Sequence, residues 1–143
     1  MSSDNPALIL RTRACLLLKH LPECDGQFSK IVQSRQPELD RNRLAAEGLM
    51  GDYIEPATWL DHKFVLIVDG NTNSWHGLFT RLLFGCCVLK VASPGNFRQW
   101  YYDRLEPWVN FVPVRADLTD LAERLDWCRS HHAECEAIAI AGR

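Results

Sequence analysis

The sequence has no apolar run long enough to cross a membrane and no excess of basic residues. The apolar run at 14–18 is too short for a span, and the polar segment 1–6 lacks the basic stretch that begins a signal peptide. A net charge of −2 and a pI near 6.2 give no reason to expect nucleic acid or an anionic membrane as a partner. Any recognition of phosphate must therefore be local.

Cysteine motifs of the usual metal or disulfide kind are also missing. The chain has six cysteines but no Cys-x-x-Cys, and no cluster of Cys and His has the spacing of metal ligands. Cys86 and Cys87 fall in an apolar, strand-like run, where cysteine behaves as a small hydrophobic residue. His131 and His132 are adjacent in a predicted helical region, so their side chains point apart. We expect reduced thiols in a reducing compartment, with no metal and no cofactor.

The composition, 47% hydrophobic and 24% charged, is that of a folded domain. From residue 63 on, apolar segments of strand length alternate with segments of helical periodicity. The run "KFVLIV" at 63–68 is typical of a strand buried on both faces, and further strands are predicted at 86–92 and at 106–114, where Val109, Phe111, Val112 and Val114 are the apolar residues.

Helices are predicted between and after these strands, at 77–85, 96–105 and 133–141, with a further one that Asp117 caps. The first of them is expected to end at Gly85 and to bury one face, formed by Leu78, Phe79, Leu82 and Leu83. The helix capped by Asp117 carries an apolar stripe of Leu118, Leu121, Leu125 and Cys128.

This alternation predicts an α/β fold, a Rossmann-like, doubly wound parallel sheet with helices on both faces. Residues 63–143 form its core, and residues 1–62 an irregular lead-in with short helices, within one partial domain of 143 residues. In the lead-in, residues 7–18 fit either a helix or a strand, and residues 56–61 fit a helical turn that begins at Pro56.

The loop at 69–76, between the first strand and the first helix of this core, is the predicted ligand site. Ligands of parallel α/β sheets bind beyond the carboxyl ends of the strands, where a helix amino terminus favours a diphosphate. Gly70 and Gly77 allow close approach of the backbone, and Arg81, one turn after Gly77, is placed to reach a phosphate. The other predicted contacts are polar groups and one flat ring for a base or sugar: Asp69, Asn71, Asn73, Ser74 and Trp75.

The same residues also fit an interpretation without a ligand. Asp69 and Gly70 can form a turn, Ser74 can cap the helix, and Arg81 can be a solvated surface charge. Neither Gly-x-Gly-x-x-Gly nor the Gly-Lys-Ser/Thr of a phosphate loop is present. Lys90, in an apolar run, either ends its strand at the cleft as a further donor contact or pairs with a carboxylate.

Several short motifs in a fixed order resemble glycosyltransferase family 90, which includes protein O-glucosyltransferases, capsule-associated xylosyltransferases and lipopolysaccharide-modifying enzymes. In order, they are "EGLMGDY" at 47–53, "DGN" at 69–71, "SWHG" at 74–77, "VLK" at 88–90, "SP" at 93–94, "WYYDRLEPW" at 100–108, "FVPV" at 111–114 and "DL" at 117–118. The resemblance covers nearly the whole chain.

The resemblance implies an enzyme of two Rossmann-like halves across a cleft (the GT-B type), with this chain as the carboxyl-terminal, donor-binding half. It implies transfer of a sugar with inversion from a nucleotide-sugar, typically UDP-linked, without an essential metal. The acceptor would be a hydroxyl of a glycan, a lipopolysaccharide or a protein. The diphosphate charge must then be offset by a helix dipole, backbone N–H groups and Arg or Lys.

Two departures from the family pattern shape what we expect of this chain. Known glucosyltransferase members carry an arginine close behind the loop glycine, where it contacts the donor diphosphate. This chain has Leu78 after Gly77, so we expect Arg81, the nearest arginine, to make that contact. The acidic catalytic base belongs to the amino-terminal half, so we expect a truncated or degenerate relative that is inactive alone and self-associates through its former domain interface. The alternatives are a non-catalytic nucleotide- or partner-binding module and an interaction domain that uses the aromatic residues at 100–108. The expected location is the cytoplasm or the periphery of a membrane.

Overall fold

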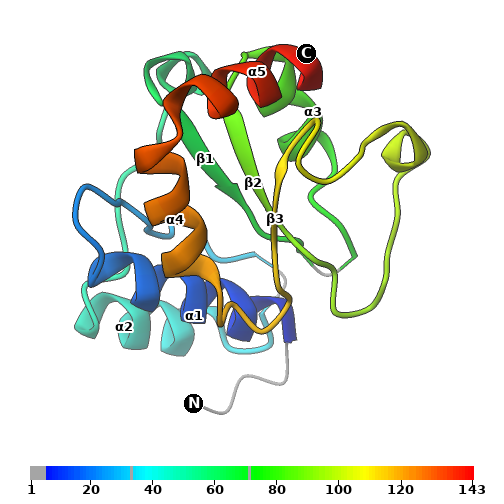
Figure 1. Ribbon diagram of the computed structural model, residues 1–143. Coiled ribbons are helices and arrows are strands. Elements are labelled where there is room, and N and C mark those ends of the chain that lie inside the picture. Colours follow the sequence, from blue (N-terminus) through cyan, green and yellow to red (C-terminus); the bar gives the residue numbers. More distant parts are fainter. Residues whose placement is uncertain (1–5, 33, 71) are drawn as a thin grey trace. The chain divides into compact units, whose positions relative to one another are not determined.

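A computed structural model describes residues 6–32, 34–70 and 72–143 (Figure 1). The chain forms two compact units, Met1–Glu55 and Pro56–Arg143, which are described here one by one.

The first unit contains two helices, α1 (Pro6–Lys19) and α2 (Pro37–Ala46). Leu10, Ala14 and Leu18 lie four residues apart and are all buried, which is the spacing of one helical face. Residues 7–18, for which the pattern allowed a helix or a strand, are therefore helical.

The second unit is a three-stranded parallel sheet with helices around it, in the strand order β1-β2-β3. This confirms the predicted α/β, Rossmann-like arrangement. Its elements along the chain are η1 (Pro56–Asp61), β1 (Phe64–Ile67), α3 (His76–Leu83), β2 (Cys87–Val91), η2 (Tyr102–Arg104), β3 (Val112–Val114), α4 (Leu121–Ser130) and α5 (His132–Gly142). No helix in the described part of the chain is both long and apolar enough to cross a membrane.

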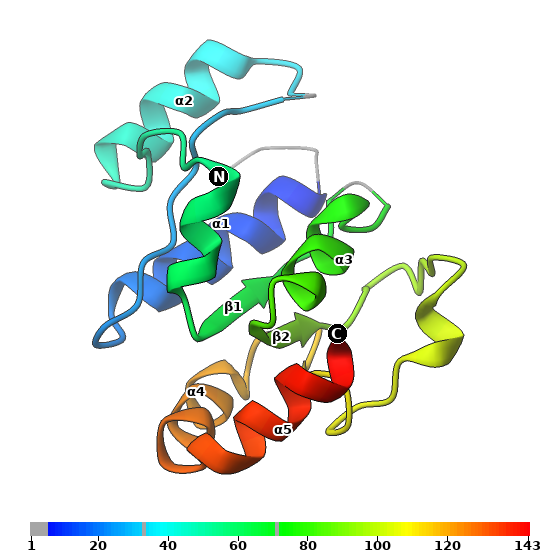
Figure 2. The ribbon, with the colours of Figure 1, turned by 90° about the horizontal axis from the view of Figure 1, so that it is seen from above.

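The two faces of the sheet are covered by different helices (Figure 2). On one face, Val65 of β1 and Val88 of β2 are register partners and share a core cluster with Leu78 and Leu82 of α3. On the other face α5 packs on β2 and α4 packs on β3. All five residues of β2 are buried, whereas β1 alternates between partly buried and buried residues because it lies at the edge of this sheet. The prediction that 63–68 is buried on both faces is therefore wrong.

Helix α3 buries a narrower face than predicted. Leu78 and Leu82 are buried, but Phe79 and Leu83 are exposed, because an eight-residue helix on one sheet face packs along only one row. The predicted end at Gly85 is confirmed: its φ is +77°, and the amides of Gly85 and Cys86 donate to the carbonyls of Leu82 and Arg81.

Residues 96–105 are not the predicted α-helix but a loop that contains only the short η2 turn. Asn96 has a φ of +52° and its amide bonds back to Ser93, so a turn breaks the helical register at its start. Val109 likewise lies in an exposed turn ahead of β3, which is shorter than the predicted strand.

The predicted cap by Asp117 is also wrong, because α4 begins at Leu121, after Asp120. Asp117 instead accepts hydrogen bonds from the amide and hydroxyl of Thr119, 3.1 and 2.8 Å away. These bonds close a turn just before α4 begins. The predicted helical stripe is confirmed for Leu121, Leu125 and Cys128, which are all buried in α4. Leu118 is buried too, but it lies in the turn before the helix with a φ of +62°.

Candidate functional site

A buried ion pair joins the carboxyl ends of β1 and β2. Lys90 Nζ lies 2.8 Å from Asp69 Oδ1, and these residues are only 7% and 3% exposed. The same ammonium group donates to the carbonyl of Val91 at 2.7 Å. Of the two alternatives for Lys90, pairing with a carboxylate is the one found, and the pair sets the position from which the 69–76 loop departs.

The loop reaches α3 through a backbone that no described side chain caps. Trp75 precedes the helix with a φ of +44°, and its ring is 67% exposed. The amide of Gly77 donates to the carbonyl of Ser74 at 2.7 Å. Because the first turn of a helix has amides without acceptors inside the helix, this end presents N–H groups and the positive end of the helix dipole to the loop. Asn71 lies outside the described residues.

A second loop, 92–111, contacts the first through side-chain hydrogen bonds, and none of its residues was among the predicted ligand contacts. Gln99 Nε2 donates to Asn73 Oδ1 at 2.6 Å, and that same oxygen accepts the amide of Trp75 at 3.1 Å. The Tyr101 hydroxyl lies 3.4 Å from the carbonyl of Trp75. The ring of Tyr102 packs on the core and lies 5.9 Å from Lys90 Nζ. Polar residues next to aromatic ones after β2 are the sequence signal for this second loop.

Three buried oxygen atoms at this place make no well-formed hydrogen bond within the described part of the chain, although the Ser74 and Tyr102 hydroxyls are neighbours: Asp69 Oδ2, Ser74 Oγ and Tyr102 Oη. Leaving a buried polar atom unpaired costs about 1–3 kcal/mol, so such atoms are rare and cluster at functional sites. Three together at the carboxyl end of a parallel sheet indicate a place that a polar ligand can fill.

Both tyrosines of the second loop remain protonated at neutral pH and can donate hydrogen bonds. Burial raises the pKa of Tyr101 to about 12, and the neighbouring Tyr102 and the charge of Asp69 add to the effect. Burial also raises the pKa of Tyr102. The adjacent Ser74 hydroxyl lowers this pKa, and the charge of Asp69 raises it. The site therefore offers neutral hydroxyl donors beside an ion pair whose net charge is zero.

Arg81 and the histidines are engaged elsewhere in the second unit. The Arg81 guanidinium carbon lies 4.3 Å from the centre of the Trp59 ring, and burial lowers the pKa of this arginine. Its Nε is buried without a hydrogen-bond partner among the described residues. His131 stacks on Trp127, and His132 stacks on Phe64, so the two imidazoles face different rings. His76 is exposed at the start of α3.

The sequence of this chain is similar to those of known proteins. Residues 19–143 match the family model for glycosyl transferase family 90. Protein O-glucosyltransferase 2 of Danio rerio is 31% identical over 100 residues, which cover 68% of this chain and 19% of that protein. Protein O-glucosyltransferase 3 of Homo sapiens is 30% identical over 114 residues, 79% of this chain and 20% of that protein. An uncharacterized protein, 035R of Invertebrate iridescent virus 3, is 40% identical over 88 residues, 62% of this chain and 8% of that protein. The chain thus spans a fifth or less of the length of these relatives.

Replacing Lys90 with Met should lower the free energy of unfolding by about 3–5 kcal/mol, because it leaves the buried Asp69 carboxylate without its partner. The double variant Lys90→Met/Asp69→Asn removes both charges and should recover most of that loss. Urea unfolding followed by tryptophan fluorescence measures both effects.

The control is Lys63→Met, at an exposed lysine just ahead of β1, which should change the free energy of unfolding by about 0.5 kcal/mol or less. Equal destabilisation in the single and double variants would contradict the assigned role of the ion pair.

Proposed function

The chain belongs to glycosyltransferase family 90, and on that premise we propose that the loop 69–77 and the loop after β2 hold the diphosphate of a nucleotide-sugar donor. The proposed donor contacts are seven loop residues and two cations. The loop residues are Asp69, Gly70, Asn71, Asn73, Ser74, Trp75 and Gly77, and the cations are Arg81 and Lys90. The chain would then take part in transferring a sugar to a hydroxyl group of a glycan or a protein.

The observation that carries this proposal is the pair of neighbouring Ser74 and Tyr102 hydroxyls near the first turn of α3, which are buried and make no well-formed hydrogen bond among the described residues. A diphosphate oxygen there would accept from Ser74 and from backbone amides while it faces the positive end of the helix dipole. The Tyr102 hydroxyl would supply a second neutral donor. Gly77 leaves room for such an approach, since a Cβ there would meet nothing nearer than Ser74 Cβ at 3.8 Å.

The diphosphate charge has to be offset without the arginine that family members carry behind the loop glycine. Leu78 takes that position and is 1% exposed in the core under α3, so it has no part in binding an anion. We assign the compensating charge first to the α3 amino terminus. Arg81, in the last turn of α3, would add to it by turning from the Trp59 ring toward the loop, whereas Lys90 adds no net charge because Asp69 neutralises it. The exposed ring of Trp75 is the flat surface for the base or the sugar.

By resemblance to the family, the donor is UDP-linked, the anomeric centre is inverted and the charge of the leaving group is offset without a metal. The names of two relatives, protein O-glucosyltransferases 2 and 3, support a protein hydroxyl as one acceptor class. A lipopolysaccharide hydroxyl is the other acceptor that the family resemblance suggests.

A non-catalytic nucleotide-binding role is the second candidate. One observation favours it: Asp69, the one carboxylate of the 69–76 loop, is already held by Lys90, so its charge is not available for general-base catalysis. Binding of UDP-sugar without turnover, both alone and with an added amino-terminal half of a family member, would support this role.

Ser74→Ala should weaken UDP binding about 10- to 150-fold in calorimetric titration. This is the loss expected when a hydrogen bond to a charged group, of about 1.5–3 kcal/mol, is removed. The same change should alter the free energy of unfolding by about 1 kcal/mol or less, because the Ser74 hydroxyl makes no well-formed hydrogen bond among the described residues. Replacing a residue with a purely structural role would instead lower the free energy of unfolding and leave UDP affinity unchanged.

Thr80→Ala is the matched control for Ser74, because it removes a hydroxyl of the following helix, α3, that already donates to the carbonyl of His76 at 2.7 Å. UDP should bind this variant as tightly as the unaltered chain. If Ser74→Ala also binds UDP normally, the proposed diphosphate site is wrong.

Arg81→Ala should likewise lower UDP affinity about 10- to 150-fold, because a charge-assisted hydrogen bond to phosphate contributes about as much binding free energy as the bond assigned to Ser74. Arg124 of α4 offers a control, because its guanidinium carbon lies 5.1 Å from the ring of Trp108 and its Nε lies 3.2 Å from Asp120 Oδ2, so its contacts are with residues outside the 69–77 loop. Arg124→Ala therefore removes a comparable arginine–tryptophan contact away from the loop. Normal UDP binding by Arg81→Ala, with lower stability, would restrict Arg81 to packing on Trp59.

A further inference from the structure

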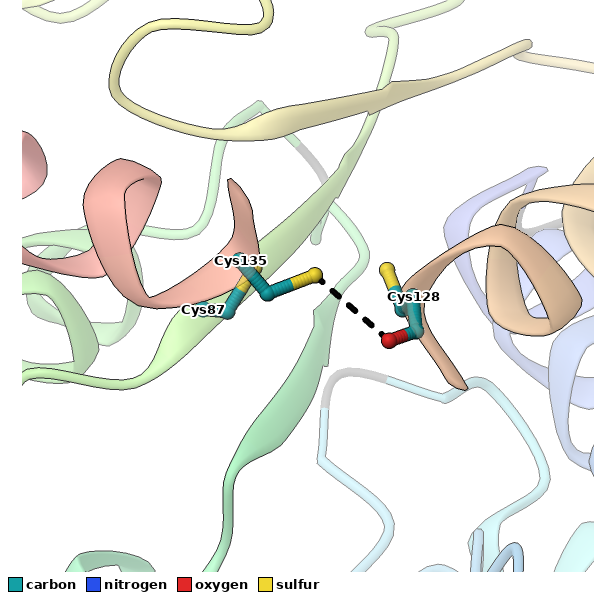
Figure 3. Close-up of side chains that lie close together, drawn as sticks. All are labelled: Cys87, Cys128 and Cys135. Atoms are coloured by element: carbon teal, nitrogen blue, oxygen red, sulfur yellow. Dashed lines mark hydrogen bonds between the residues drawn. The ribbon is translucent and has the colours of Figure 1, made fainter. Parts of the chain in front are cut away.

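Three cysteines that lie far apart in the sequence meet at the end of the sheet away from the candidate site (Figure 3). Cys87 begins β2, Cys128 lies in the last turn of α4 and Cys135 in the first turn of α5. Their sulfur atoms all lie within 4.8 Å of one another, and the residues are between 0 and 3% exposed. Lys90 and the ligand loop lie at the carboxyl end of the same strand, so this cysteine triad is a separate feature.

The spacing of the three sulfurs fits a single metal ion. A metal–thiolate bond of about 2.3 Å places the sulfurs of a three-coordinate site about 4 Å apart. The triad reaches that spacing with side-chain shifts of less than about 1 Å. Figure 3 shows the Cys135 thiol turned toward α4, where it donates to the carbonyl of Cys128 at 3.7 Å. That hydrogen bond already holds the α4–α5 connection in the conformation that brings the thiols together.

The ligand set favours a soft, monovalent ion over zinc. Among the described residues, the group contains no fourth Cys, His, Asp or Glu, whereas structural zinc sites have four ligands. Thiolates select soft ions such as Cu(I). Two or three thiolates around a monovalent ion leave a net negative charge in a buried place, and the first turn of α5, which carries Cys135, is where a helix dipole offsets such a charge.

We propose that Cys87, Cys128 and Cys135 bind one Cu(I) ion through their three sulfur atoms, as thiolates whose S–H protons are released to solvent on binding. The ion would tie the start of β2 to both helices on that face of the sheet. Nothing in this proposal depends on the donor site, because no residue is shared between them.

The test is an anaerobic titration of the full chain with Cu(I) in competition with a chromophoric Cu(I) chelator, followed by X-ray absorption at the copper edge. We expect one tightly held ion per chain with three sulfur neighbours, which excess Zn²⁺ does not displace. Two sulfur neighbours, nitrogen or oxygen neighbours, or displacement by Zn²⁺ would overturn the proposal.

Cys128→Ala should lose stoichiometric copper, whereas the control Cys86→Ala should retain it. Cys86 is a buried cysteine next to the triad whose thiol instead contacts the carbonyl of Trp59 at 3.4 Å. Equal copper binding by the two variants would also refute the site. If Cys128→Ala does not fold, as judged by circular dichroism, the absorption spectrum of the unaltered chain decides the question without any variant.

Discussion

The buried pair of Asp69 and Lys90 is the interaction on which the candidate site depends. Each charge would be strongly destabilising by itself in a place so little exposed, and the 2.8 Å contact with the added bond to Val91 offsets that penalty. Because the two residues end adjacent parallel strands, their contact sets where the ligand loop begins. The direction in which α3 presents its amino terminus follows from that starting point.

The polar oxygens around this pair are arranged at a cost to the folded chain. Ser74 and Tyr102 bury neighbouring hydroxyls that make no well-formed hydrogen bond among the described residues. Contacts from Gln99 to Asn73 and from Tyr101 to Trp75 hold the second loop against the first. Such an arrangement is consistent with a preorganised place for an anion, in which donors already point at the ligand and little reorganisation is needed on binding.

The sequence predicted best where one periodic signal decides the structure. The run "KFVLIV" and the Leu78–Leu82 spacing identified β1 and α3, and the loop between them followed from the parallel topology. Prediction failed where tertiary contacts decide: Tyr101 and Tyr102 pack on the core from a loop, and Asp117 turns the chain before α4 begins. The cysteine triad could not be predicted, because its members come from three elements and have no motif spacing. For the site, pattern alone named Lys90 but left its partner open.

The central claim is that a diphosphate binds at the amino terminus of α3. Backbone amide chemical shifts of the ¹⁵N-labelled chain, recorded with UDP and with uridine at equal concentrations, test it most directly. The account predicts the largest changes at residues 74–78 with UDP, and much smaller changes there with uridine, because the phosphates make the contacts. Changes confined to other elements, or the same changes with uridine as with UDP, would contradict it.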